Sequence, residues 1–195
     1  MASRFAKLLN ERGNHEVGNL NSHVFEQVNE GAIVGDETID NFLLVELYFD
    51  HEVADDATSP MVRKARVSAD VTKNTHLIAS VEERVSIPGF YTEQFDDFFN
   101  EKGEKAAIYI LAPGKRFETS AFALCAETGK EVTKVQNGME AYFDGDKKKY
   151  IIIDPTKAPD AYATAAKKFL VVANENDDDL NTLCGKSLVR LEVLA

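Results

Sequence analysis

The sequence predicts a mainly β protein, at the margin of the α+β class, with the architecture of an antiparallel β-sandwich or a partly open barrel. The first observation is the alternation in Asn41–Asp50, which we call the organising strand, where Leu43, Val45, Leu47 and Phe49 form one entirely apolar face. The second is a succession of roughly nine or ten short strand-like stretches separated by turn residues. The third is the lack of alternating strand and helix patterns, which disfavours a parallel sheet.

The first forty residues differ in character from the rest of the chain. Ser3 can cap a short helix that runs to Arg12, and Gly13 can end it. From there to Asp40 the sequence is too irregular for one long helix and too apolar for a solvated linker. We therefore divide the chain into an N-terminal helix and extended arm, residues 1–40, and a single β-rich domain, residues 41–195.

Three interpretations of this arm remain open, the third being that it is simply disordered. An isolated helix of this length is marginal in water, so its apolar residues need a surface on which to dock. That surface can belong to a neighbouring subunit, or the arm can wrap around its own domain. The anchors under the first interpretation are Phe5, Leu8, Leu9, Val24 and Phe25.

One or two helices are expected to be inserted into the β-rich domain. The clearest prediction is a helix from Thr92 to Gly103, which covers the core with an apolar stripe at helical spacing. The stripe consists of Tyr91, Phe95, Phe98 and Phe99.

Turn signals divide the second half of the chain into strands. Asn137–Gly138 and Asp144–Gly145 are two-residue hairpin signals, and Ala112–Lys115 fits a type II turn. The strands expected in the domain after the organising one are Val62–Ser68, His76–Val85, Ala106–Leu111, Arg116–Leu124, Val132–Val135, Met139–Phe143, Tyr150–Asp154, Phe169–Ala173 and Ser187–Leu194.

Composition excludes several classes of function. The net charge of −11 works against a groove that neutralises phosphates, so we expect no direct nucleic-acid partner. No apolar stretch approaches the length of a membrane span, so we expect no membrane partner. Cys125 and Cys184 are expected to be reduced, which fits the cytosol or a particle assembled in cytosol.

No motif for catalysis or phosphate binding survives inspection. Gly185–Ser187 resembles the end of a phosphate-binding loop, but Leu180 occupies the position of the required first glycine. The four histidines are scattered, and none lies in a recognisable nucleophile arrangement. Two pairs of adjacent carboxylates occur, Glu82–Glu83 and Asp96–Asp97. Adjacent side chains on a regular element point away from each other, so we expect the carboxylates of each pair to lie on a solvated face. We predict no catalytic residue and no enzyme activity.

Metal and sugar sites are weak alternatives. His51 with Asp55 and Asp56, or the run Asn174–Asp179, offers oxygen and nitrogen ligands, but neither has the pattern of a built metal site. We therefore predict no metal and no cofactor. A sugar-binding platform would need exposed aromatic rings, and the chain has no Trp. The tyrosines available for it are Tyr109, Tyr142, Tyr150 and Tyr162.

The chain also resembles the small structural proteins that decorate or cement the capsids of tailed bacteriophages. The resemblance is spread over Asn41–Asp50, His76–Val85, Gly114–Leu124 and Met139–Ile153. It implies a virion protein assembled in the host cytoplasm, whose partners are the major capsid protein, copies of itself, or both. Its site would be the N-terminal arm. A self-contained ligand- or carbohydrate-binding β-domain is the alternative, followed by a hydrolase with dispersed active-site residues.

Overall fold

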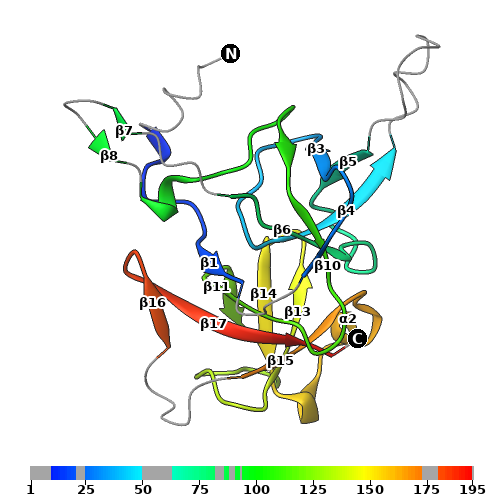
Figure 1. The fold of residues 1–195 in the computed structure, drawn as a ribbon. Helices are drawn as coiled ribbons and strands as arrows, with labels where there is room; N and C mark the ends of the chain where they lie inside the picture. The colour runs from blue at the N-terminus through cyan, green and yellow to red at the C-terminus, as the bar shows by residue number, and fades with distance from the viewer. Residues whose placement is uncertain are drawn as a thin grey trace.

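The computed structural model describes residues 10–20, 25–49, 63–81, 86–87, 91–92, 94–172 and 180–194. These residues form two sheets that lie one above the other (Figure 1). The mainly β class is confirmed, and of the two architectures expected, the arrangement is that of a sandwich. No helix in these ranges is long and apolar enough to cross a membrane.

The lower sheet in Figure 1 holds most of the second half of the chain. Its strands follow the order β1-β11-β17-β15-β13-β14-β12, and β16 also pairs with β17. The bounds are β1 Gly18–Asn19, β11 Arg116–Thr119, β12 Phe122–Leu124, β13 Glu140–Asp144, β14 Lys149–Ile153, β15 Lys168–Val171, β16 Asn181–Leu183 and β17 Lys186–Val193.

The upper sheet holds the organising strand, β4, at its centre. Its order is β2-β10-β6-β4-β5-β3-β9. The bounds are β2 Glu26–Gln27, β3 Ala32–Val34, β4 Leu44–Phe49, β5 Arg63–Arg66, β6 His76–Ile78, β9 Lys105–Ala106 and β10 Ile108–Ile110. A separate hairpin pairs β7, Ser86–Ile87, with β8, Tyr91–Thr92. The short helical elements are η2 Phe95–Asp97, η3 Pro155–Lys157 and α2 Asp160–Thr164.

Both sheets are mixed rather than purely antiparallel. β3 pairs with β5 in parallel, and so does β12 with β14. Both parallel pairs join strands that are not neighbours in the sequence. Hairpin signals report only sequential antiparallel neighbours, so they could not predict these two pairings.

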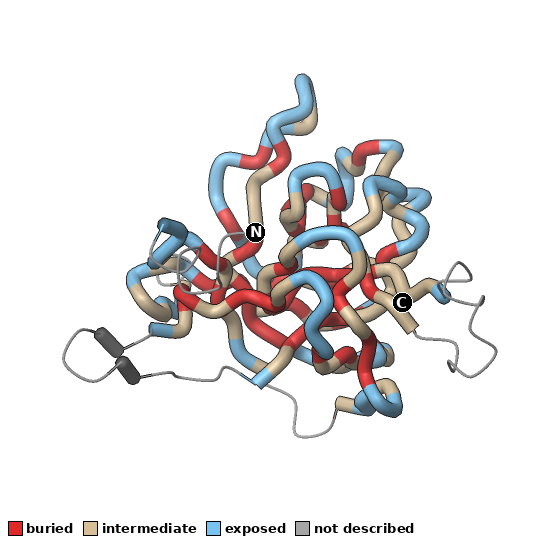
Figure 2. The backbone as a smooth tube through the Cα atoms, turned by 90° about the horizontal axis from the view of Figure 1, so that it is seen from above, coloured by how far each residue is buried: buried red, intermediate tan, exposed pale blue. Residues whose placement is uncertain are grey.

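The core fills the space between the sheets, where buried backbone runs through the middle of the molecule (Figure 2). Three rings from the lower sheet occupy its centre: Phe117, Tyr150 and Phe169, with centroids 5.3 to 5.8 Å apart. The Tyr150 hydroxyl donates to the Phe42 carbonyl across the core at 3.1 Å. Full burial raises the pKa of Tyr150 well above its ordinary value, because the phenolate would lose its hydration.

The described part of the arm lies on the chain's own two sheets. β1 pairs with β11, β2 pairs with β10, and β3 lies between β5 and β9. Val17, Val34 and Ile39 are at most 1% exposed. These residues therefore follow the interpretation in which the arm wraps around its own domain.

The helix expected over Thr92–Gly103 is wrong. Its only helical residues in the described ranges are the single turn η2, after which Phe98 is extended and Asn100 bridges to Ile39. The Asp97 carboxylate accepts hydrogen bonds from the backbone of Gln94 and Gly13. The Gln94 contact belongs to a capping box, which favours the start of a helix, whereas the extended Phe98 and the bridge from Asn100 to Ile39 take the following residues out of helical geometry.

One hairpin expectation is confirmed and the other is wrong. β13 and β14 pair in antiparallel register from Glu140↔Ile153 to Asp144↔Lys149, although four residues, not two, connect them. Residues 132–135 form no strand. Val132 instead belongs to a small apolar cluster with Tyr142 and Ile151.

Deletion of residues 1–40 should abolish cooperative folding of the protein. The deletion removes β1, β2, β3 and several buried side chains, whereas deletion of residues 1–9 removes none of them. Urea denaturation followed by circular dichroism should show a sigmoidal transition for the shorter deletion only. A native-like transition of the 1–40 deletion would contradict the integration of the arm.

Phe169→Ala should lower the free energy of unfolding by about 3–5 kcal/mol, because it leaves a cavity among three rings. Val81→Ala is the matched control, since Val81 is 82% exposed and should change stability by less than about 0.5 kcal/mol. Urea denaturation measures both. Equal effects would contradict the assigned core.

Candidate functional site

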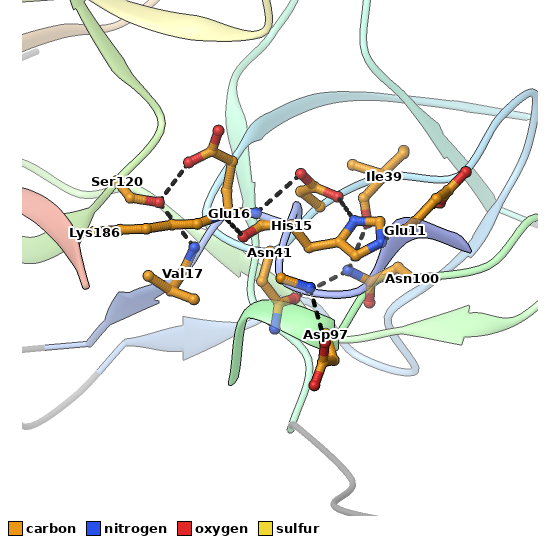
Figure 3. Close-up of polar contacts among 12 residues, drawn as sticks. Glu11, His15, Glu16, Val17, Ile39, Asn41, Asp97, Asn100, Ser120 and Lys186 are labelled. Atoms are coloured by element: carbon orange, nitrogen blue, oxygen red, sulfur yellow. Dashed lines mark hydrogen bonds and ion pairs between the residues drawn. The ribbon is translucent and has the colours of Figure 1, made fainter. Parts of the chain in front are cut away.

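The N-terminal segment Gly13–Val17 is held by hydrogen bonds to η2 and to Ser120, the residue that follows β11 (Figure 3). The Gly13 amide donates to the Asp97 carboxylate at 2.9 Å, and the His15 amide donates to the Asp96 carbonyl at 3.1 Å. The Val17 amide donates to the Ser120 hydroxyl at 2.9 Å. We call these contacts, together with those that Asp40 and Lys186 make to the same segment, the polar clamp.

His15 lies at the centre of the polar clamp and is 7% exposed. Its Nδ1 is 2.7 Å from an Asp40 carboxylate oxygen, and its ring lies 4.6 Å from the Phe99 ring. A carboxylate only accepts, so Nδ1 must carry the proton. Nε2 has no hydrogen-bond partner in the described ranges and lies 3.5 Å from a Glu11 carboxylate oxygen. Both ring nitrogens therefore face carboxylates.

Ser120 does not act together with His15. Its hydroxyl donates to the Glu16 carboxylate and accepts from the Val17 amide. Lys149 pairs with the other oxygen of Glu16, and Lys186 donates to the His15 carbonyl. A serine nucleophile needs its base within hydrogen-bond reach, and here the hydroxyl is engaged elsewhere. The polar clamp holds backbone in place and does not form a catalytic triad.

A pair of buried asparagines holds the chain on either side of Asp40, next to the polar clamp. The Asn100 side-chain amide donates to the Asn41 side chain at 2.9 Å and to the Ile39 carbonyl at 3.0 Å. Asn41 in turn exchanges two hydrogen bonds of 3.0 Å with the backbone of Ser80. Both asparagines are at most 4% exposed, so their satisfied amides fix the chain entering β4.

A groove of about 1080 Å³ opens next to the polar clamp. It lies between residues that follow β6 and β1 on one side and the β16–β17 hairpin on the other. The lining is Gly18, Asn19, Leu20, Phe42, Ala79, Ser80, Val81, Phe95, Tyr109, Glu118, Leu180, Asn181, Thr182, Leu183 and Leu188. Grooves of this size, mostly apolar with a few polar groups, are typical binding sites.

The shape of the groove depends on close backbone packing at Gly18. A Cβ atom there would lie 2.3 Å from the Glu118 carbonyl and 2.5 Å from the Phe42 ring. Phe42 itself has a left-handed backbone, with φ of 62°. Its amide donates to the Ile78 carbonyl at 2.7 Å, which helps to hold that conformation.

Glu118 is the one acidic residue in the groove lining, and it is 4% exposed. One carboxylate oxygen accepts from Arg190 at 2.7 and 3.0 Å and from Asn181 at 2.8 Å. Its charge is therefore compensated within the fold. The apolar side chains are left as the groove's main means of attraction.

The four tyrosines considered for sugar binding do not form one platform. Tyr109 lines the groove, whereas Tyr150 is in the core. The rings of Tyr142 in β13 and Tyr162 in α2 pack against each other, with their centroids 6.3 Å apart, and neither lines the groove. Burial raises the pKa of Tyr142 to about 12, and burial together with a hydrogen bond to Glu140 raises the pKa of Tyr162 further.

Of the predicted arm anchors, the structure describes one. Phe25 is half-buried and packs against the core, with its ring 6.1 Å from the Tyr109 ring. The other four, Phe5, Leu8, Leu9 and Val24, lie outside the described residues.

The expectation of solvated carboxylates is wrong at Asp96 and Asp97. They are 7% and 2% exposed, because η2 turns them toward the N-terminal segment. Glu82–Glu83 lies outside the described residues.

The metal candidates cannot be located. His51, Asp55, Asp56 and Asn174–Asp179 lie outside the described residues. Within the described ranges, no group of three or more His, Cys, Asp or Glu residues is arranged to hold a metal ion.

The glycine of Gly185–Ser187 belongs to a hairpin turn. Cys184 and Gly185 connect β16 to β17, with φ of 51° and 75°. Two positive φ angles are typical of a tight two-residue hairpin, which explains the motif without phosphate. Neither Cys125 nor Cys184 forms a disulfide, as predicted.

The polar clamp and the groove were not predicted from sequence. Their partners are far apart in the chain: 25 residues separate His15 from Asp40, and 103 separate Val17 from Ser120. The apolar residues between Val17 and Ile39 were the one sequence signal, since they require a surface on which to dock.

Comparison with known proteins identifies the family to which the chain belongs. The family model described as YonC prophage protein matches residues 11–194. The chain belongs to the YonC prophage protein family. It is also 46% identical over 195 residues to the SPbeta prophage-derived uncharacterized protein YonC of Bacillus subtilis (strain 168), which covers 100% of this chain and 99% of the relative. No solved structure matches. The match to a prophage family supports the phage origin implied by the resemblance.

Asp40→Ala should destabilise the protein by about 2 kcal/mol, because the His15 ring and the Glu16 amide lose their acceptor. Asp36→Ala is the control. Asp36 likewise pairs with a basic side chain, since its carboxylate lies 3.8 Å from an Arg66 guanidinium nitrogen. The Asp36 side chain is 59% exposed, so its loss should cost less than about 1 kcal/mol. Urea denaturation at neutral pH measures both. Equal costs would contradict the clamp.

Proposed function

We propose that this YonC family member is a structural component of the phage particle, specifically a capsid decoration or auxiliary protein. It binds the major capsid protein, copies of itself, or both, and it performs no catalysis. Its location is the virion capsid, which is assembled in the host cytoplasm.

The groove beside the polar clamp is the observation that carries this proposal. Val81, on its lining, is 82% exposed, an unusual position for a bulky apolar side chain. Leu20, Tyr109 and Leu183 on the same lining are also partly exposed. An exposed apolar surface of this kind indicates a site for another protein or ligand.

The proposed mechanism is the burial of this surface many times over. Capsids repeat each contact by symmetry, so weak individual contacts add up through effective concentration. The net charge of −11 keeps decorated particles from associating with one another. Membership of a prophage family is consistent with this role and does not distinguish it from other phage functions.

The structure changes which part of the N-terminal arm can act as a latch, meaning the segment that anchors the protein to a neighbouring subunit. The chain from Gly13 to Val17 is fixed by the polar clamp, and Phe25 packs on its own body. We therefore assign the latch to the residues before the clamp, which include Phe5, Leu8 and Leu9.

Fractionation of induced phage particles tests the proposal. A lysogen that carries the gene with an epitope tag is induced, and particles are separated on a density gradient. The protein should co-migrate with particles at a constant ratio to the major capsid protein and remain after a high-salt wash. Recovery in the soluble lysate alone, with particles of normal composition, would overturn the proposal.

A ligand-binding β-domain is the second candidate, because a groove of about 1080 Å³ is also large enough for a small molecule. This candidate predicts a soluble protein in the same gradient. It also predicts a rise in melting temperature with one member of a sugar and metabolite panel.

A further inference from the structure

We propose that the groove is a receptor for the first nine residues of this chain, exchanged between copies. This inference rests on the proposed function, because it names the partner of the same groove. The occupant is a short basic and apolar segment, and the groove supplies the apolar surface that receives it.

The composition of residues 1–9 fits this groove. Phe5, Leu8 and Leu9 recur at helical spacing, so one face of a short helix is apolar. Such a short helix needs a surface on which to fold. Leu20, Leu183 and Val81 on the groove lining are apolar and partly or fully exposed.

Charge favours the same pairing. The segment carries Arg4 and Lys7 and no carboxylate, whereas the whole chain has a net charge of −11. A cationic segment is therefore drawn to the body of any copy. The pairing should weaken as salt is raised, because exposed charges are screened.

The path of the chain brings segment and groove together. Gly13 and His15 are bound by Asp97 and Asp96 of η2, and the first residue of η2, Phe95, lines the groove. The segment thus leaves the body next to the groove. Nine residues span roughly 13 Å as a helix and about 30 Å when extended, enough to reach a groove on either copy.

Exchange between copies follows from this arrangement. A subunit whose terminal segment and receptor groove lie together can trade segments with a second copy around a two-fold axis. The contacts within one subunit and between two subunits are then the same. Crowding on a capsid surface favours the exchanged form, because the neighbour's segment is present at high effective concentration.

Binding of a synthetic peptide to the shortened protein tests the receptor. The body is the chain without residues 1–9, and the probe is a peptide of residues 1–9 with a C-terminal fluorophore. Fluorescence anisotropy should show saturable binding that weakens as salt is raised. Leu8→Asp in the peptide should weaken binding at least about tenfold, because it places a charge on the apolar face.

Matched variants of the body locate the site. Val81→Asp should weaken binding at least about tenfold and leave folding intact, because the side chain is 82% exposed. Leu194→Asp is the control: that side chain is 40% exposed and does not line the groove. Circular dichroism verifies that each variant is folded. No saturable binding, or equal losses for both variants, would overturn the inference.

The outcomes separate this inference from the proposed function. Particles that contain the protein, combined with a body that does not bind the peptide, would refute the receptor and leave the virion role standing. Peptide binding combined with absence from particles would refute the virion role and leave the receptor standing. Mixing a Val81→Asp full chain with a Leu8→Asp full chain should yield more dimer than either alone in analytical ultracentrifugation, and no increase would refute exchange between copies.

Discussion

The fold depends on hydrogen bonds that satisfy the backbone of Gly13–Val17, the segment that precedes β1. Buried amides and carbonyls need partners, and a segment outside regular sheet pairing must find them elsewhere. Here Asp97, Asp40 and Ser120 supply acceptors, and Lys186 supplies a donor. These partners come from widely separated parts of the chain, so the polar clamp ties η2, the residues before β4 and the lower sheet to one short segment.

The groove is a consequence of the same constraint. Fixing Val17 places Gly18 and Asn19 against β11, where only a glycine fits between Phe42 and the Glu118 carbonyl. The neighbouring chain from Ala79 to Val81 is held by the Asn41–Ser80 hydrogen bonds. Because hydrogen bonds fix both of these stretches, the apolar lining stays open toward solvent and does not collapse onto the core. A preformed apolar surface costs little to reorganise when a partner binds.

The polar clamp also shows why residue types alone do not define an active site. Serine, histidine and aspartate all occur within it, and His15 is oriented by Asp40 as a catalytic base would be. Yet the Ser120 hydroxyl is engaged by Glu16 and by the Val17 amide, and His15 is 7% exposed. Chemistry requires the base and nucleophile to share a proton, and here the His15 ring is bound to Asp40 while the Ser120 hydroxyl is bound to Glu16 and Val17.

The sequence by itself determined the β class, the organising strand and the β13–β14 hairpin, because these follow from local alternation and turn residues. It failed where distant groups compete with local preference. The aromatic stripe after Thr92 has helical spacing, but Asn100 pairs with the distant Ile39, and the helical turn ends after Asp97. The parallel pairs, the burial of Asp96 and Asp97, the polar clamp and the groove were decided by tertiary structure alone. Their partners meet only after the two sheets have stacked, and no periodicity within a single stretch carries that information.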